Sequence, residues 1–168
     1  MNAIDTHKNS VVTHMTIEAA TDQVWRSLVF YEGIDSVPPL YLRLLLPAPI
    51  RTEGAKSAVG DVATCLYQGG YLLKRVTRID VDRLYEFTVD EQHLPIGGGI
   101  RLTGGSYALR DLGPGCTDLA ITTRYVSGHR PRWLVAPVEA AVCHVFHRHL
   151  LSAIKTKAEL TAEPGTAP

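Results

Sequence analysis

Residues Pro131–Leu160, which read PRWLVAPVEAAVCHVFHRHLLSAIKTKAEL, set the architecture expected for the whole chain. Apolar side chains recur here at the spacing of an α-helix, about 100° per residue, and indicate one long helix with a bend near Pro137. The predicted apolar face consists of Val138, Val142, Val145, Phe146, Leu150, Ala153, Ile154 and Leu160, and the opposite face of Arg148, Ser152, Lys155 and Glu159. Because about 20 helical residues span about 30 Å, such a helix can cross an entire sheet.

The segments before this helix alternate with a period of two and predict β-strands. The predicted strands are Val11–Glu18, Val62–Gln68, Tyr71–Asp80, Arg83–Glu91, Ile100–Leu112 and Cys116–Ser127. Gly69-Gly70 predicts a two-residue hairpin turn, since both glycines tolerate positive φ. A short amphipathic helix capped by Thr21 follows the first strand. The order predicts an α+β fold with an antiparallel meander and a long closing helix.

One domain is expected over residues 11–160, with disordered tails at 1–10 and 161–168. Within it, the segment 40–46 is short, apolar and flanked by prolines. Its side chains cannot all face one core, so we expect it either to pack across a cavity mouth or to meet a second copy of the chain or a membrane surface.

Composition excludes several functional classes. The 17 Lys and Arg residues balance the 17 Asp and Glu residues. The chain therefore has no excess positive charge to attract the phosphates of nucleic acid. Three scattered cysteines indicate reduced thiols in a cytoplasmic protein. No apolar run approaches the roughly 18 residues of a transmembrane helix. Residues 97–99 are glycines that join two strands rather than precede a helix, so we expect no nucleotide or other cofactor. We expect this loop to act either as a flap over the cavity mouth or as a plain hairpin connection.

The element order and the segment Ala20–Trp25, which has the pattern A-x-x-x-V-W, resemble the START-like (SRPBCC) superfamily. This group includes polyketide cyclase/dehydrase proteins, lipid-transport proteins and the birch-pollen allergen family. The resemblance implies a helix-grip fold, in which a curved antiparallel sheet wraps around the C-terminal helix and encloses a ligand cavity. Because members are carriers, sensors, cyclases or lyases, the resemblance leaves the function open.

Two ionisable residues interrupt the apolar face of the long helix, Glu139 and His149. Burial without a partner would raise the pKa of the carboxyl and lower that of the imidazole, which suits general acid–base catalysis. They lie about 15 Å apart along the helix and cannot act on the same atoms. Alternatively, Glu139 pairs with Arg130 or Arg132, and His149 bonds to a strand or loop.

The remaining histidines of the helix offer a weaker metal hypothesis. His144 and His147 are three residues apart, a spacing that can share a metal ion, but zinc usually takes three or four protein ligands. The sequence places no further ligand beside them, so we expect a partly exposed pair without metal. Cys143 has no evident base to activate it.

Aromatic residues on the strands are expected to line the cavity. Tyrosine combines apolar area with a hydroxyl that can orient a ligand, and Tyr107 is a third acid–base candidate. Arg101, on the same predicted face as Tyr107, could neutralise a carboxylate or enolate. The full predicted ligand site is Tyr85, Phe87, Arg101, Tyr107, Tyr125, Glu139, Val142, Phe146 and His149.

Three functions fit these features. The first is a carrier or sensor that binds a small hydrophobic molecule, such as a lipid, a polyketide-like compound or an aromatic compound. The second is a cyclase, dehydratase or hydrolase that uses Glu139, His149 or a tyrosine as acid or base. The third is an interaction module that docks through the apolar segment 40–46.

Overall fold

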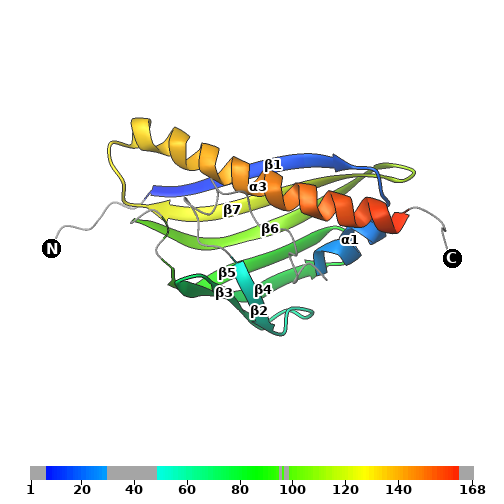
Figure 1. The fold of residues 1–168 in the computed structure, drawn as a ribbon, viewed down its shortest axis with the longest axis horizontal. Helices are drawn as coiled ribbons and strands as arrows, with labels where there is room; N and C mark the ends of the chain where they lie inside the picture. The colour runs from blue at the N-terminus through cyan, green and yellow to red at the C-terminus, as the bar shows by residue number, and fades with distance from the viewer. Residues whose placement is uncertain (1–6, 30–48, 95, 97–98, 163–168) are drawn as a thin grey trace.

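A computed structural model describes residues 7–29, 49–94, 96 and 99–162. The elements are β1 (His7–Ile17), α1 (Thr21–Val29), β2 (Pro49–Gly54), β3 (Val62–Tyr67), β4 (Gly70–Asp80), β5 (Leu84–His93), β6 (Ile100–Gly113), β7 (Cys116–Ser127) and α3 (Arg132–Ala162). The strands form one antiparallel seven-stranded sheet in the order β1-β7-β6-β5-β4-β3-β2. In Figure 1, α3 runs across this sheet beside β1 and β7, with α1 near its C-terminal end. The predicted α+β helix-grip architecture is confirmed.

The sheet bends at β-bulges that glycines make possible. In β6 the pairing register with β7 shifts between Leu102 and Gly104. Gly104 has φ +157°, and a Cβ there would lie 2.5 Å from the Phe87 carbonyl oxygen. A bulge of this kind bends its strand and increases the local twist. The glycine therefore lets β6 approach β5 closely while the sheet curves.

The packed core lies at one end of α3. Its fully buried members on this helix are Leu151, Ile154 and Ala158, which pack in one cluster with Trp25 of α1 and Leu119 of β7. Burying a leucine or isoleucine side chain contributes roughly 1.5–3 kcal/mol to stability. The C-terminal half of α3 therefore packs against the sheet and α1, while its first half lies over a cavity.

The predicted apolar face of α3 is partly wrong. Val138 is 60% exposed and Leu160 is 69% exposed, whereas His147 and Leu151, which were not assigned to that face, have no exposure. Apolar residues occur on several sides of this helix, and Trp133 is 78% exposed. The 3.6-residue periodicity therefore does not single out the buried side.

Several predicted boundaries also differ. β1 begins at His7, inside the segment expected to be a tail, because its ladder with β7 extends to the pair His7–Ser127. At the other end, α3 continues to Ala162. The hairpin turn is Gln68-Gly69, since Gly70 already pairs with Tyr67 as part of β4. The prediction also missed β2, a short edge strand that begins at a proline.

Within the described ranges, no helix combines the length and apolar character needed to cross a bilayer. The segment 40–46 lies outside the described residues, as does most of the glycine-rich loop expected to form a flap.

Candidate functional site

A cavity of about 320 Å³ lies between the sheet and the first half of α3. Its walls are mostly apolar and come from α1, from six strands and from α3. The described apolar wall residues are Trp25, Leu28, Ile50, Ala63, Leu66, Leu72, Val76, Phe87, Val89, Leu94, Ile96, Ile100, Leu102, Ile121, Val142, Phe146 and Leu150. An apolar enclosure with few polar groups is the usual form of a site for a small molecule.

All but one of the residues predicted for the ligand site line this cavity. These are Tyr85, Phe87, Tyr107, Tyr125, Glu139, Val142, Phe146 and His149. Arg101 is the exception, because its side chain is exposed and lies outside the cavity wall. The bulge after Leu102 changes the alternation of β6, so Leu102 faces the cavity in its place.

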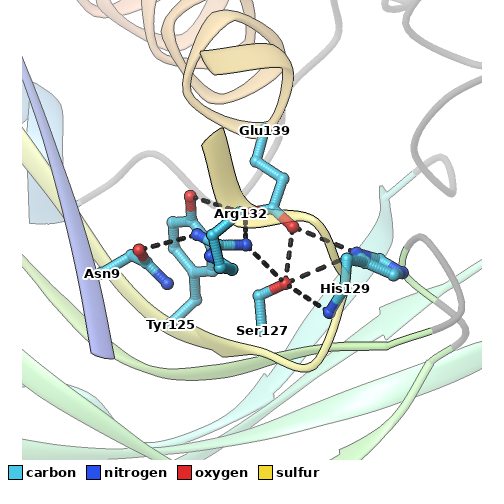
Figure 2. A network of polar contacts seen from close by, with 6 residues as sticks. All are labelled: Asn9, Tyr125, Ser127, His129, Arg132 and Glu139. Carbon is cyan, nitrogen blue, oxygen red and sulfur yellow. Dashed lines mark hydrogen bonds and ion pairs between the residues drawn. The ribbon is translucent and has the colours of Figure 1, made fainter. Parts of the chain in front are cut away.

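Glu139 is held in a polar network at the start of α3 (Figure 2). Its Oε1 accepts hydrogen bonds from Ser127 Oγ at 2.6 Å and from His129 Nδ1 at 3.0 Å. Its Oε2 accepts from Arg132 Nη1 at 2.9 Å and from the Tyr125 hydroxyl at 3.3 Å. The predicted pairing of Glu139 with Arg132 is confirmed.

The same network joins α3 to both strands beneath it. Arg132 Nη2 donates to Asn9 Oδ1 of β1 at 2.9 Å, and Arg132 Nη1 donates to Ser127 Oγ of β7 at 3.1 Å. Burial raises the pKa of Glu139, but the bonds from Ser127, His129 and Arg132 and the charge of Arg132 outweigh it and lower the net pKa. Glu139 is therefore an ionised structural anchor at neutral pH and not a general acid.

His147 is not the partly exposed residue that was predicted. It has no exposure, its Nδ1 lies 2.8 Å from Thr13 Oγ1 of β1, and its Nε2 lies 2.7 Å from Thr123 Oγ1 of β7. Thr13 Oγ1 also lies 2.7 Å from His144 Nδ1. Burial, aided by the nearby charge of His144, lowers the pKa of His147 to about 4, so the ring is neutral at neutral pH.

Neither a metal site nor an activated thiol is evident around these histidines. Within the described part of the chain, no group of three or more His, Cys, Asp or Glu side chains is arranged to hold a metal ion. The Cys143 Sγ does lie 3.5 Å from His147 Nε2, a neighbour that the sequence analysis missed although the two are one helical turn apart. Burial raises the pKa of this thiol to about 11, so it stays protonated.

Lys74 is a cavity residue that the sequence analysis did not select. It lies on β4, and its Nζ is 4.8 Å from the centre of the Phe87 ring. Burial acts to lower the pKa of Lys74, but the acidic groups of Tyr67 and Cys65, with a smaller effect from Tyr107, raise the net pKa. Burial also raises the pKa of Tyr67 and of Tyr107. Lys74 also forms a side-chain hydrogen bond with Cys65, and at neutral pH it is an ammonium group.

Solved structures with the same architecture identify the fold. The Zhui aromatase/cyclase from a Streptomyces species superposes with a TM-score of 0.66 at 21% identity, over 96% of this chain and 100% of its own. A START superfamily protein from Mycobacterium smegmatis gives a TM-score of 0.63 at 13% identity, over 90% of this chain and 98% of its own. This chain has the START-like fold.

The START-like fold is also that of norcoclaurine synthase from Thalictrum flavum. Its structure in complex with dopamine and hydroxybenzaldehyde gives a TM-score of 0.61 at 15% identity, over 98% of this chain and 92% of its own. No family model and no curated protein matches the sequence of this chain. Identities at this level establish the START-like architecture, and the chemistry has to come from the side chains.

One polar atom of a cavity-lining residue, Nε2 of His149, has no hydrogen-bond partner among the described residues. This atom is buried. The predicted bond from His149 to a strand or loop is therefore not found at this atom. Tyr85, by contrast, donates to the Lys56 carbonyl at 3.0 Å, and burial raises its pKa to about 12. Lys74, Tyr67 and Tyr107 are further polar residues in the cavity wall.

Proposed function

We propose that this protein binds a small hydrophobic molecule in its internal cavity, as a carrier or sensor. The observation that carries the proposal is the cavity itself, about 320 Å³ of mainly apolar space beneath the first half of α3. Close packing is the rule inside proteins, and voids larger than a water molecule are few. A void of this size has a cost in stability that a bound ligand would offset.

The dimensions favour a compact ligand. Sites for small molecules occupy about 300–1,000 Å³, and this cavity lies at the lower end of that range. Its aromatic wall includes Tyr85, Phe87 and Tyr107, with neighbouring ring centres 6.4 Å apart. Rings at this spacing suit edge or offset contact with another ring, so the proposed ligand has an aromatic or polycyclic body.

A pair of substitutions on α3 tests this proposal. Val142 lines the cavity, whereas Val138, one turn earlier on the same helix, is 60% exposed. We expect Val142→Trp to fill the cavity and abolish binding of the neutral fluorescent probe N-phenylnaphthylamine. Val138→Trp adds the same indole outside and should leave binding unchanged. Equal binding by both variants, or no binding by the unaltered protein, would contradict the proposal.

The natural ligand can be sought directly. Protein purified without organic solvent is extracted, and the extract is compared by mass spectrometry with one prepared from Val142→Trp protein. A lipophilic compound present in stoichiometric amount only in the first extract would identify the ligand. The Val142→Trp comparison removes compounds that adhere to the protein surface.

A second function, turnover of the bound molecule by a cyclase-type reaction, is favoured by one observation. The buried and unpartnered Nε2 of His149 lies in the cavity wall, where an imidazole can act as acid or base. Metabolite extracts incubated with the protein and with His149→Leu test this alternative. Compounds consumed by the first and not by the second, while both bind N-phenylnaphthylamine, would establish an enzyme. Identical metabolite profiles would exclude this role for His149.

A further inference from the structure

We infer that the ligand is a carboxylic acid with an aromatic body, and that Lys74 binds its carboxylate inside the cavity. This inference rests on the proposed function and specifies the chemical class of the ligand. Three features of the structure carry it: the place of Lys74 on the inner face of the sheet, the lack of a carboxylate partner, and the hydroxyl and aromatic groups around it.

Lys74 is partly exposed and lines the cavity from the inner face of β4. Side chains two residues apart on a strand point to the same face, and its neighbours on that face are Leu72 and Val76. These two are 2% and 3% exposed, and both line the cavity together with Lys74. The ammonium group therefore points inward between two core residues and not toward bulk solvent.

No carboxylate lies within ion-pair distance of Lys74 in the described parts of the chain, whereas Arg51 of the cavity wall and Arg132 of α3 have such partners. Arg51 Nη2 lies 2.6 Å from Glu53 Oε1, and Arg132 Nη1 lies 2.9 Å from Glu139 Oε2. Buried charges are normally paired, because removing an ion from water is costly. The cation–π contact with Phe87 and a side-chain hydrogen bond with Cys65 offset only part of this cost. An anionic ligand would supply the missing partner.

The groups near Lys74 match an anion attached to a ring. The hydroxyls of Tyr67 and Tyr107 are protonated at neutral pH and can donate to carboxylate oxygens. The Phe87 ring lies beside the cation, and the centre of the Tyr107 ring is 6.4 Å from that of Phe87. Both rings offer apolar contact to the body of the molecule. Carboxylic acids are ionised at neutral pH and ordinary phenols are not, which is why we choose a carboxylate.

The test uses two displacing compounds of the same shape. Naphthoate carries the carboxylate, and naphthamide is its uncharged analogue; each is titrated against protein-bound N-phenylnaphthylamine. We expect naphthoate to displace the probe at about tenfold lower concentration than naphthamide, the usual effect of a charge-assisted hydrogen bond. Lys74→Met should remove this preference while N-phenylnaphthylamine still binds, and Lys74→Arg should retain most of it.

Arg101→Met is the matched control, since it removes one positive charge from the exposed side of β6. It should leave the preference for naphthoate intact. Equal displacement by both compounds, or a preference that survives Lys74→Met, would overturn the inference while the proposed binding function stands. If the unaltered protein fails to bind N-phenylnaphthylamine, the proposed function itself is contradicted. Circular dichroism of each variant verifies that the sheet and helix are intact.

Discussion

Glu139 is a charged residue whose surroundings keep it ionised and hold the first turns of α3 to the sheet. Its side chain is 5% exposed, and the charge of Arg132 faces it at 2.9 Å. Replacing it with glutamine would leave Arg132, whose side chain is 17% exposed, without its counter-ion, and breaking a buried ion pair typically costs 3–5 kcal/mol. We predict that Glu139→Gln lowers the free energy of unfolding at neutral pH by about 3 kcal/mol, measured by urea denaturation.

The pH dependence of this effect has a definite sign. Because the folded pKa of Glu139 lies below the ordinary value of 4.5, the unfolded chain takes up the proton first as pH falls. The difference between the two proteins should therefore be full above pH 4.5 and should shrink in more acidic solution. Glu159→Gln, at a half-exposed ion pair on the same helix, serves as control and should cost less than about 1 kcal/mol. A constant difference at all pH values would argue against a lowered pKa.

Lys74 is expected to reduce the stability of the ligand-free protein. Its charge lies in a mainly apolar cavity and has no carboxylate partner among the described residues. Replacing such a charge with an apolar side chain of similar volume is often neutral or stabilising. We predict that Lys74→Met raises the free energy of unfolding by about 1 kcal/mol in thermal or urea denaturation of ligand-free protein. A loss of stability would show instead that Lys74 serves the fold.

The cavity residues differ in how far the sequence could reveal them. Tyr107 and Phe87 follow from simple alternation along their strands, and the same rule applied to Tyr71–Asp80 would have placed Lys74 beside Leu72 and Val76. That signal was present but was not used. The position of Arg101 could not be predicted in this way, because the bulge at Leu102 depends on contact between β6 and its neighbours.

At the scale of secondary structure elements, the two halves of α3 have different roles. The C-terminal half packs against α1 and the sheet, whereas the first half covers the cavity. We predict that Ile154→Ala, at a fully buried position, lowers the free energy of unfolding by about 3 kcal/mol through lost burial and a new void. Val138→Ala, at an exposed position, should change it by less than about 0.5 kcal/mol. Equal effects in chemical denaturation would contradict this division of the helix.

Secondary structure elements were predicted more accurately where the local sequence signals agree with one another. Strands bounded by glycine turns, such as β7 after residues 113–115, were placed correctly because alternation and turn chemistry agree. The buried side of α3 was misjudged because apolar residues surround the helix, and only the sheet and α1 decide which side is covered. β2 was missed because a six-residue edge strand carries little pattern of its own.

At the scale of the whole molecule, His147 connects three elements that are distant in sequence. Its ring nitrogens contact Thr13 of β1 and Thr123 of β7 from a position on α3. Its folded pKa of about 4 lies below the ordinary value of 6.5, so between these pH values the unfolded chain binds a proton that the folded protein excludes. Acidification over this range therefore favours unfolding of the whole domain.

We predict that this histidine contributes up to about 3 kcal/mol of acid destabilisation between pH 6.5 and pH 4. The contribution is absent above pH 6.5, where the ring is neutral in both states. The free energy of unfolding should fall less steeply with decreasing pH in His147→Gln, and the difference in slope should correspond to about one bound proton. Urea denaturation at a series of pH values measures both slopes. Parallel curves for the two proteins would show that His147 titrates normally in the folded state.

The pairing of β1 with β7 has a consequence for how the chain acquires its structure during synthesis. Among the strands of this sheet, β1 is synthesised first and its partner β7 last, so β1 stays unpaired until residues 116–127 have emerged. Joining such remote segments is slow because the intervening loop loses entropy before any contact forms. The hairpins between β3 and β7 need no such delay. The compartment for a ligand is completed only after β7 and α3 have been synthesised.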